Sequence, residues 1–167
     1  MENYGIYTNT IIGWIQDFLT GRYQRVAVNG ENSNWEEVTS GIPQGSVLGP
    51  LLFVVYINDL PDHVDSEAYL FAEDTKIFRI ITGENDHNIL QEDLQKMEDW
   101  SNNWLLKFHS EKCKYMNITR TTNEGNREYR LLDQNITKVN EEKDIGVTID
   151  SLLSFKQHIC EKVIKAN

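Results

Sequence analysis

The chain has 167 residues, of which 40% are hydrophobic, and its formal net charge is -10. A chain of this length and composition can bury one hydrophobic core, so we expect about one domain and not a disordered chain. The longest apolar run, residues 47–57, is too short to span a bilayer, and the N-terminal residues lack a signal-peptide pattern. These features favour an intracellular protein with no membrane segment, and they leave nucleus and cytoplasm open.

The two cysteines, Cys113 and Cys160, follow neither a disulfide framework nor a zinc-ribbon pattern. Each lies near a histidine, His109 and His158 respectively, so a zinc site stays conceivable. No CxxC or HxxxH pair accompanies them, and we do not predict a zinc protein.

The negative charge is unusual for a protein that binds nucleic acid, because neutralising phosphates requires basic side chains. The imbalance is greater in the first half of the chain than in the second. The candidates for contact with nucleic acid are seven cations: Arg22, Arg25, Lys76, Arg79, Lys107, Lys112 and Lys114.

The first 60 residues predict a helix, a hairpin and a second helix. Apolar residues recur at helical spacing over residues 8–19. Residues 22–28 and 35–40 alternate around an Asn29-Gly30 turn, and we expect a hairpin because Asn-Gly tolerates positive φ. Gly and Pro exclude a regular element at residues 41–45, and Ser46 is the expected N-cap of an apolar helix over residues 47–60. Amide groups at that helix start suit phosphate, sugar or base contacts, although a plain strand-to-helix connection explains the same turn.

The remaining residues predict a second hairpin, a long helix and short strands. Residues 67–72 and 75–81 form the hairpin, with Glu73 and Asp74 at its tip. Apolar residues on one face predict a helix over residues 86–106. Strands are expected over residues 113–119, 129–132, 136–139 and 145–149, and a last helix over residues 155–165. The predicted fold class is therefore α+β, with an antiparallel sheet backed by helices.

Several segments resemble the reverse transcriptases of non-LTR (LINE-type) retrotransposons, in the order in which those enzymes carry them. The string PQGSVLGPLLF from Pro43, followed by INDLP at residues 57–61, is similar to motif B. Residues 71–75, FAEDT, resemble the FADDT hairpin of motif C, and residues 104–108 with Lys112 and Cys113 resemble motif D. Residues 143–150, 153–155 and 158–159 resemble the segment that follows the palm. The resemblance implies a partial polymerase palm with fingers residues over 1–122, and a post-palm (thumb-side or connection) segment over 123–167.

The family activity implied by this resemblance is RNA-directed DNA polymerisation by two-metal nucleotidyl transfer. It implies Glu73 and Asp74 as catalytic, metal-binding residues for Mg²⁺, and Lys112 as a catalytic proton donor. The turn Pro43, Gln44 and Gly45 would contact the incoming dNTP and the template base. The implied partners are an RNA template, a DNA primer and a dNTP. Read without the resemblance, Glu73-Asp74 is a solvated turn and Lys112 a solvated surface lysine.

Two departures from the family pattern predict weak metal binding and a catalytically dead chain. Glu73 stands where the family has aspartate, and a misplacement of about 1 Å at such a site can cost on the order of 100-fold in rate. Motif A, which holds the other metal-binding aspartate, has no counterpart in these 167 residues, so we expect a truncated domain. The alternative is a non-catalytic module that binds protein or RNA on a retained palm scaffold. A third possibility is a separate chain that supplies motif A in trans.

Overall fold

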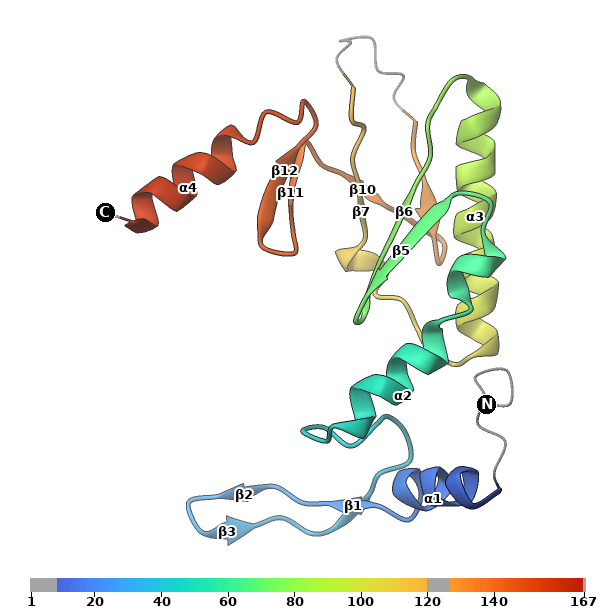
Figure 1. Ribbon diagram of the computed structural model, residues 1–167, viewed down its shortest axis with the longest axis vertical. Helices are drawn as coiled ribbons and strands as arrows, with labels where there is room; N and C mark the ends of the chain where they lie inside the picture. Colours follow the sequence, from blue (N-terminus) through green and yellow to red (C-terminus); the bar gives the residue numbers. More distant parts are fainter. Residues whose placement is uncertain (1–8, 120–126, 167) are drawn as a thin grey trace. The chain divides into compact units, whose positions relative to one another are not determined.

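The computed structural model describes residues 9–119 and 127–166 (Figure 1). These residues form two compact units. The first contains the described residues up to Asp59 together with Phe71–Asp74, and the second contains Leu60–Leu70 and the described residues from Thr75 onward. Among the described residues, no helix is long and apolar enough to cross a membrane.

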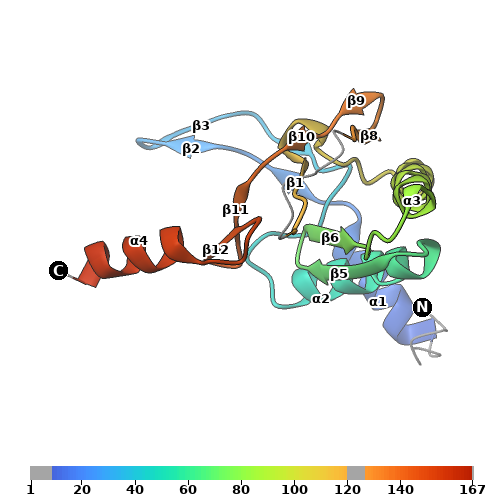
Figure 2. The same cartoon turned by 90° about the horizontal axis from the view of Figure 1, so that it is seen from above.

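The first unit begins with the predicted helix and hairpin. Helix α1 (Asn9–Leu19) buries Ile15. Strand β1 (Tyr23–Gln24) pairs antiparallel with β4 (Glu36–Glu37). Strand β2 (Ala27–Val28) pairs antiparallel with β3 (Glu31–Asn32), side by side in Figure 2. Asn29 and Gly30 form the turn with φ values of +51° and +87°. The Asn-Gly signal was therefore sufficient to locate this hairpin, because both residue types tolerate the left-handed region.

Helix α2 (Leu48–Ile57) completes the first unit and is apolar in nearly every position. Gly49, Leu52 and Ile57 are its buried residues. The helix is shorter than the predicted range 47–60, because the chain turns at Asn58 and a 3-10 turn, Leu60–His63, follows in the second unit.

The second unit contains the longest helix and a hairpin whose tip, Phe71–Asp74, belongs to the first unit. Strands β5 (Glu67–Phe71) and β6 (Asp74–Phe78) pair with each other, and helix α3 spans Glu84–Asn103. The prediction extended this helix to residue 106, but Leu105 adopts φ +55°, which ends the helical path. Seven of the ten buried hydrophobic residues of the described chain belong to the second unit; the ten are Ile15, Leu52, Ile57, Leu60, Leu94, Met97, Trp100, Tyr129, Leu131 and Ile136.

The remaining strands are short pairs and not members of one sheet. Strand β7 (Lys114–Tyr115) pairs parallel with β10 (Thr137–Lys138), β8 (Arg130–Leu131) pairs antiparallel with β9 (Gln134–Asn135), and β11 (Glu141–Asp144) pairs antiparallel with β12 (Val147–Asp150). Helix α4 (Lys156–Ala166) ends the described chain.

The α+β class is confirmed, whereas the single antiparallel sheet is not what the described residues form: all six of their sheets have two strands, and one pair is parallel. The sequence prediction also missed β9 and β11. Strand β9 follows a turn at Leu132 and Asp133, both with positive φ, and β11 is the polar sequence EEKD, so neither shows an apolar alternation. The predicted boundary between residues 122 and 123 lies outside the described residues and stays a prediction.

The N-terminus of α3 is closed by Asp86. Its carboxylate accepts hydrogen bonds from the amide and hydroxyl of Thr82 (2.8 and 2.7 Å) and from the amide of Gly83 (3.2 Å), and it pairs with Arg79. The hydrogen bonds from Thr82, with those from Arg79 and Gly83, lower the pKa of Asp86 to about 2 from its ordinary 3.8. This carboxylate stabilises the start of the helix only while it is ionised.

The lowered pKa of Asp86 predicts a pH dependence of stability. Because the folded chain holds this proton less tightly than the unfolded chain, the contribution is present above about pH 4 and is lost as pH falls towards about 2. We expect the free energy of unfolding, measured by urea denaturation, to be higher for wild type than for Asp86→Asn by a constant amount near neutral pH. The two free energies should converge between pH 4 and pH 2. A difference that stayed constant down to pH 2 would contradict this assignment.

Candidate functional site

The turn Pro43-Gln44-Gly45 is folded back on the first turn of α2. The hydroxyl of Ser46 donates to the carbonyl oxygen of Pro43 (2.7 Å) and accepts from the amide of Gly49 (3.0 Å). Ser46 therefore caps the helix through its side chain, as predicted, although Val47 occupies the residue position directly before the helix. Gly45 adopts φ +79°, a conformation that favours glycine.

Gly49 makes this folding back possible. A Cβ atom at this position would lie 2.8 Å from Ser46 Oγ, 3.0 Å from the backbone oxygen of Pro43 and 3.2 Å from Ile42 Cδ1. No side chain larger than hydrogen fits without displacing the turn. The result is a half-buried Pro43 and two exposed residues, Gln44 and Gly45, which the turn presents to solvent.

The acidic pair lies at the end of the β5–β6 hairpin. Ala72 and Glu73 form the tip, with Ala72 at φ +49°, and Asp74 is already the first residue of β6. The predicted tip Glu73-Asp74 is thus shifted by one residue. Behind it, the rings of Tyr69 and Phe78 stack with centroids 5.2 Å apart, which ties the two strands together. Both carboxylates are exposed, and residues 71–74 belong to the first unit together with the Pro43–Gly45 turn.

These two carboxylates alone do not fit a pair of divalent ions. Two ions held about 3.5 to 4 Å apart need oxygen ligands from several elements, and adjacent side chains on one hairpin offer only one arm. In the part of the chain that the structure describes, no three His, Cys, Asp or Glu side chains gather where they could hold a metal ion.

Lys112 belongs to the second unit, whereas Glu73 and Asp74 belong to the first. It is exposed and ends a 3-10 turn, Ser110–Lys112, in which its amide donates to the carbonyl of His109 (2.9 Å). The neighbouring Cys113 is half-buried, and burial raises the pKa of its thiol. Cys113 therefore behaves as a packing residue and not as a reactive thiolate.

Five of the seven cations proposed to contact nucleic acid lie against groups of their own unit. Arg22 donates to the carbonyls of Leu19 and Gly41, and the guanidinium of Arg25 lies 4.7 Å from the ring centroid of Trp35. The other three form ion pairs: Arg79 with Asp86, Lys76 with Asp144, and Lys114 with Glu142. Fewer of these cations are therefore available to contact phosphates than a count of basic residues suggests.

Asp93, which the sequence analysis did not single out, holds the base of the acidic hairpin. Its side chain is fully buried on α3, and its two oxygens accept the amides of Asp65 (2.9 Å) and Ser66 (2.8 Å), directly before β5. Lys96 joins the carboxylates of Asp93 and Asp65 at 3.2 and 2.6 Å. Burial by itself raises the pKa of a carboxyl group, but the interactions with Ser66, Asp65 and Lys96 outweigh it and lower the pKa of Asp93. No local sequence signal marks this contact, because its partners are 27 and 28 residues away.

Comparison with known proteins identifies the family. Residues 2–149 match the family described as reverse transcriptase (RNA-dependent DNA polymerase). The chain is 32% identical over 158 residues to the RNA-directed DNA polymerase from mobile element jockey of Drosophila melanogaster, covering 87% of this chain and 17% of the relative. It is 27% identical over 155 residues to the probable RNA-directed DNA polymerase from transposon X-element of the same organism, covering 89% and 17%.

A third relative gives the same result. The probable RNA-directed DNA polymerase from transposon BS of Drosophila melanogaster is 29% identical over 161 residues, covering 88% of this chain and 17% of the relative. No solved structure matches significantly. The chain thus spans about one sixth of the length of these curated relatives. It belongs to the reverse transcriptase family and corresponds to part of the reverse transcriptase domain of non-LTR, LINE-type retrotransposons.

Proposed function

We propose that this chain supplies the nucleotide-facing turn and the acidic hairpin of an RNA-directed DNA polymerase with a palm-type fold. Its partners would be an RNA template, a DNA primer and a dNTP. The observation that carries the proposal is the construction of the turn: Gly49 lets residues 43–46 fold against α2, and the exposed Gln44-Gly45 step stands beside a capped helix start. The tip residues of the acidic hairpin fall in the same compact unit.

In this proposal the turn recognises the nucleotide through backbone and amide groups. Gln44 exposes a side chain that both donates and accepts hydrogen bonds, and Gly45 lets a base or sugar approach the backbone closely. Glu73 and Asp74 contribute one arm of a site for a divalent cation, with Mg²⁺ as the family ion. Lys112 would act as a general acid towards the leaving pyrophosphate, a role for which its exposed ammonium group is suitable.

We further propose that the isolated chain does not synthesise DNA. The two carboxylates form an incomplete donor set, and Glu73 is one methylene longer than the family aspartate. Either change alone is sufficient to misplace the ions, and a misplacement of about 1 Å at such a site can cost on the order of 100-fold in rate.

Primer extension and Mn²⁺ titration test this proposal together. We expect no extension of a DNA primer on an RNA template with Mg²⁺ or Mn²⁺ above the level of Asp74→Asn, and weak Mn²⁺ binding that broadens amide NMR signals at residues 72–75. Asp74→Asn should abolish the broadening, whereas Asp62→Asn, which changes an exposed acid of the other unit, should leave it unchanged. Extension by wild type above the Asp74→Asn level would refute the inactivity, and broadening elsewhere would refute the site.

The second candidate is a non-catalytic module that binds RNA or protein on the same scaffold. The buried contacts of the second unit favour it, because Leu94, Tyr129, Leu131 and Ile136 form a hydrophobic cluster that needs no metal or nucleotide. A cooperative thermal transition of a soluble monomer, together with absent primer extension, would support this candidate. Aggregation of the purified chain would argue against it.

A further inference from the structure

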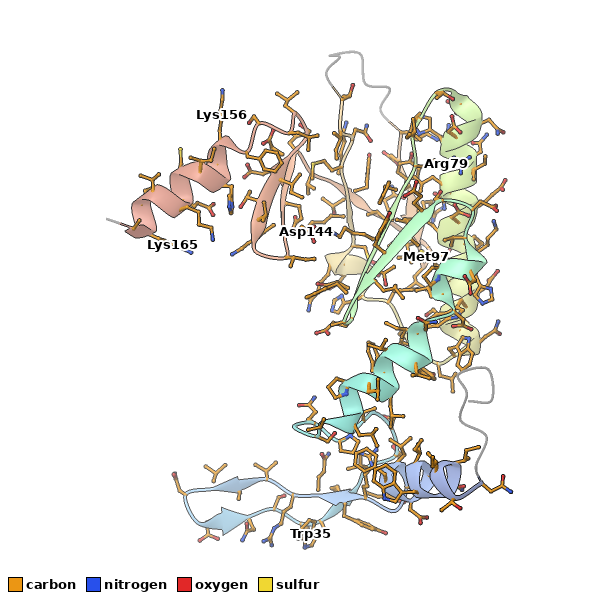
Figure 3. The ribbon with its side chains drawn as sticks, in the orientation of Figure 1. Trp35, Arg79, Met97, Asp144, Lys156 and Lys165 are labelled. Atoms are coloured by element: carbon orange, nitrogen blue, oxygen red, sulfur yellow. The ribbon has the colours of Figure 1, made fainter. Side chains whose placement is uncertain are left out.

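Two lysines of the second unit lie against carboxylates of a single strand, β11. Lys114 Nζ donates to Glu142 Oε2 at 2.7 Å, and Lys76 Nζ pairs with Asp144 Oδ2. Lys114 comes from β7 and Lys76 from β6, so the two lysines are 38 positions apart in the sequence (114 minus 76). Figure 3 shows Asp144 at the end of β11, on the side of the β11–β12 hairpin nearer the β5–β6 hairpin. The strand therefore brings a charge to each of two lysines from separate elements.

The alternation of β11 directs both carboxylates to the same side. Glu142 and Asp144 are half-buried, whereas Glu141 and Lys143 are exposed. Since successive residues of a strand point to opposite faces and rise about 3.3 Å each, the two carboxylates share a face and lie about 6.6 Å apart along the strand. Pairing with β12 fixes this register, with Glu142 opposite Ile149 and Asp144 opposite Val147. A row of two negative charges on a short extended backbone resembles what a nucleic acid strand presents through successive phosphates.

Stability gives little reason for these two ion pairs. The side chains of Lys76 and Lys114 remain 50% and 42% exposed, and exposed ion pairs contribute about 0–1 kcal/mol each. A lysine that contacts a phosphate instead releases a counterion, so the same two cations have a larger effect on binding of nucleic acid. Lys76 also follows Asp74 by two residues on β6, the strand that begins with a family-motif acid.

We propose that β11 masks a phosphate-binding pair formed by Lys76 and Lys114, and that single-stranded RNA contacts this pair when the charge of β11 is removed. The strand acts as an internal competitor, since Glu142 and Asp144 occupy the ammonium groups that the RNA backbone would contact. This inference goes beyond the proposed function because it concerns binding and not synthesis. The choice of RNA as ligand rests on the proposed function, whereas the masking of the lysines does not.

The test compares two variants of equal charge by fluorescence anisotropy with a labelled 20-nucleotide single-stranded RNA. Glu142→Gln with Asp144→Asn removes the masking carboxylates and keeps their size. The control, Asp133→Asn with Glu141→Gln, removes two exposed acids, of which Glu141 lies on the opposite face of β11. We expect the masking variant to bind RNA about tenfold more tightly than the control at 50 mM salt. Its log-log salt dependence should be steeper by about 1.4, which corresponds to about 0.7 for each of two single-strand phosphates.

A second pair of substitutions identifies the cations. Adding Lys76→Gln and Lys114→Gln to the masking variant should abolish the gain, and the same two substitutions in wild type should leave its weak RNA binding unchanged. Equal binding by the masking and control variants would overturn the proposal, and so would a gain that survives without the lysines. Circular dichroism verifies that each variant folds. If the double variant unfolds, the single variants Glu142→Gln and Asp144→Asn replace it, and each is expected to bind RNA about threefold more tightly than wild type. This test does not measure primer extension, so a failure of the proposed function in the primer-extension experiment leaves the masking inference unaffected.

Discussion

Replacement of Asp93 by alanine is expected to lower the free energy of unfolding by about 3 kcal/mol, because it leaves two inward-facing amide groups without an acceptor. The carboxylate is fully buried and accepts the amides of Asp65 and Ser66, and each hydrogen bond to a charged group is worth about 1.5–3 kcal/mol. The loss also frees Lys96 from one of its two carboxylates. The chain that leads into β5 would then detach from α3.

Urea denaturation followed by tryptophan fluorescence measures this loss, since Trp100 is buried on the same helix. Asp93→Asn keeps one acceptor oxygen, and we expect a smaller loss of about 1–2 kcal/mol. Asp99→Ala is the matched control: it removes an exposed carboxylate from the same helix and should change stability by less than about 0.5 kcal/mol. If Asp93→Ala and Asp99→Ala were equally stable, Asp93 could not hold the base of the hairpin.

Replacement of Gly49 by alanine is expected to cost about 1–2 kcal/mol and to loosen the Pro43–Gly45 turn. The added Cβ would lie 3.0 Å from the backbone oxygen of Pro43 and 2.8 Å from the capping hydroxyl of Ser46. Overpacking of this kind costs about 1–3 kcal/mol, while alanine in place of glycine within a helix returns up to about 1 kcal/mol. The cost of the collision exceeds the gain in helix propensity, because the backbone oxygen of Pro43 cannot move aside as a flexible side chain can.

Gly13→Ala is the control that isolates helix propensity. Gly13 lies within α1, and a Cβ there meets nothing within 4 Å, so we expect a gain of about 0.5–1 kcal/mol. Hydrogen exchange read by mass spectrometry should show faster exchange at residues 42–50 in Gly49→Ala and no such change in Gly13→Ala. Unchanged exchange in Gly49→Ala would mean that the turn does not depend on the close approach.

Short-range signals made much of the fold predictable. The Asn29-Gly30 turn located the first hairpin, and helical periodicity located α1 and α3 to within a few residues at most ends. The family was also predictable, because the strings from Pro43 and around Glu73 are specific in their order and spacing. The roles of Pro43, Gln44, Gly45, Glu73, Asp74 and Lys112 stay predictions, since nothing in the chain's own contacts tests them.

The sequence by itself determined the local elements, the family and the residue types of the candidate site, because those depend on neighbours along the chain. Only the tertiary structure decided which distant groups meet. It joined Asp93 to the amides before β5, paired β7 with β10 in parallel, and laid the polar strand β11 against Lys76 and Lys114. These contacts depend on charges, buried amides and strand edges brought together over tens of residues, and such pairings leave no periodic pattern in a single sequence.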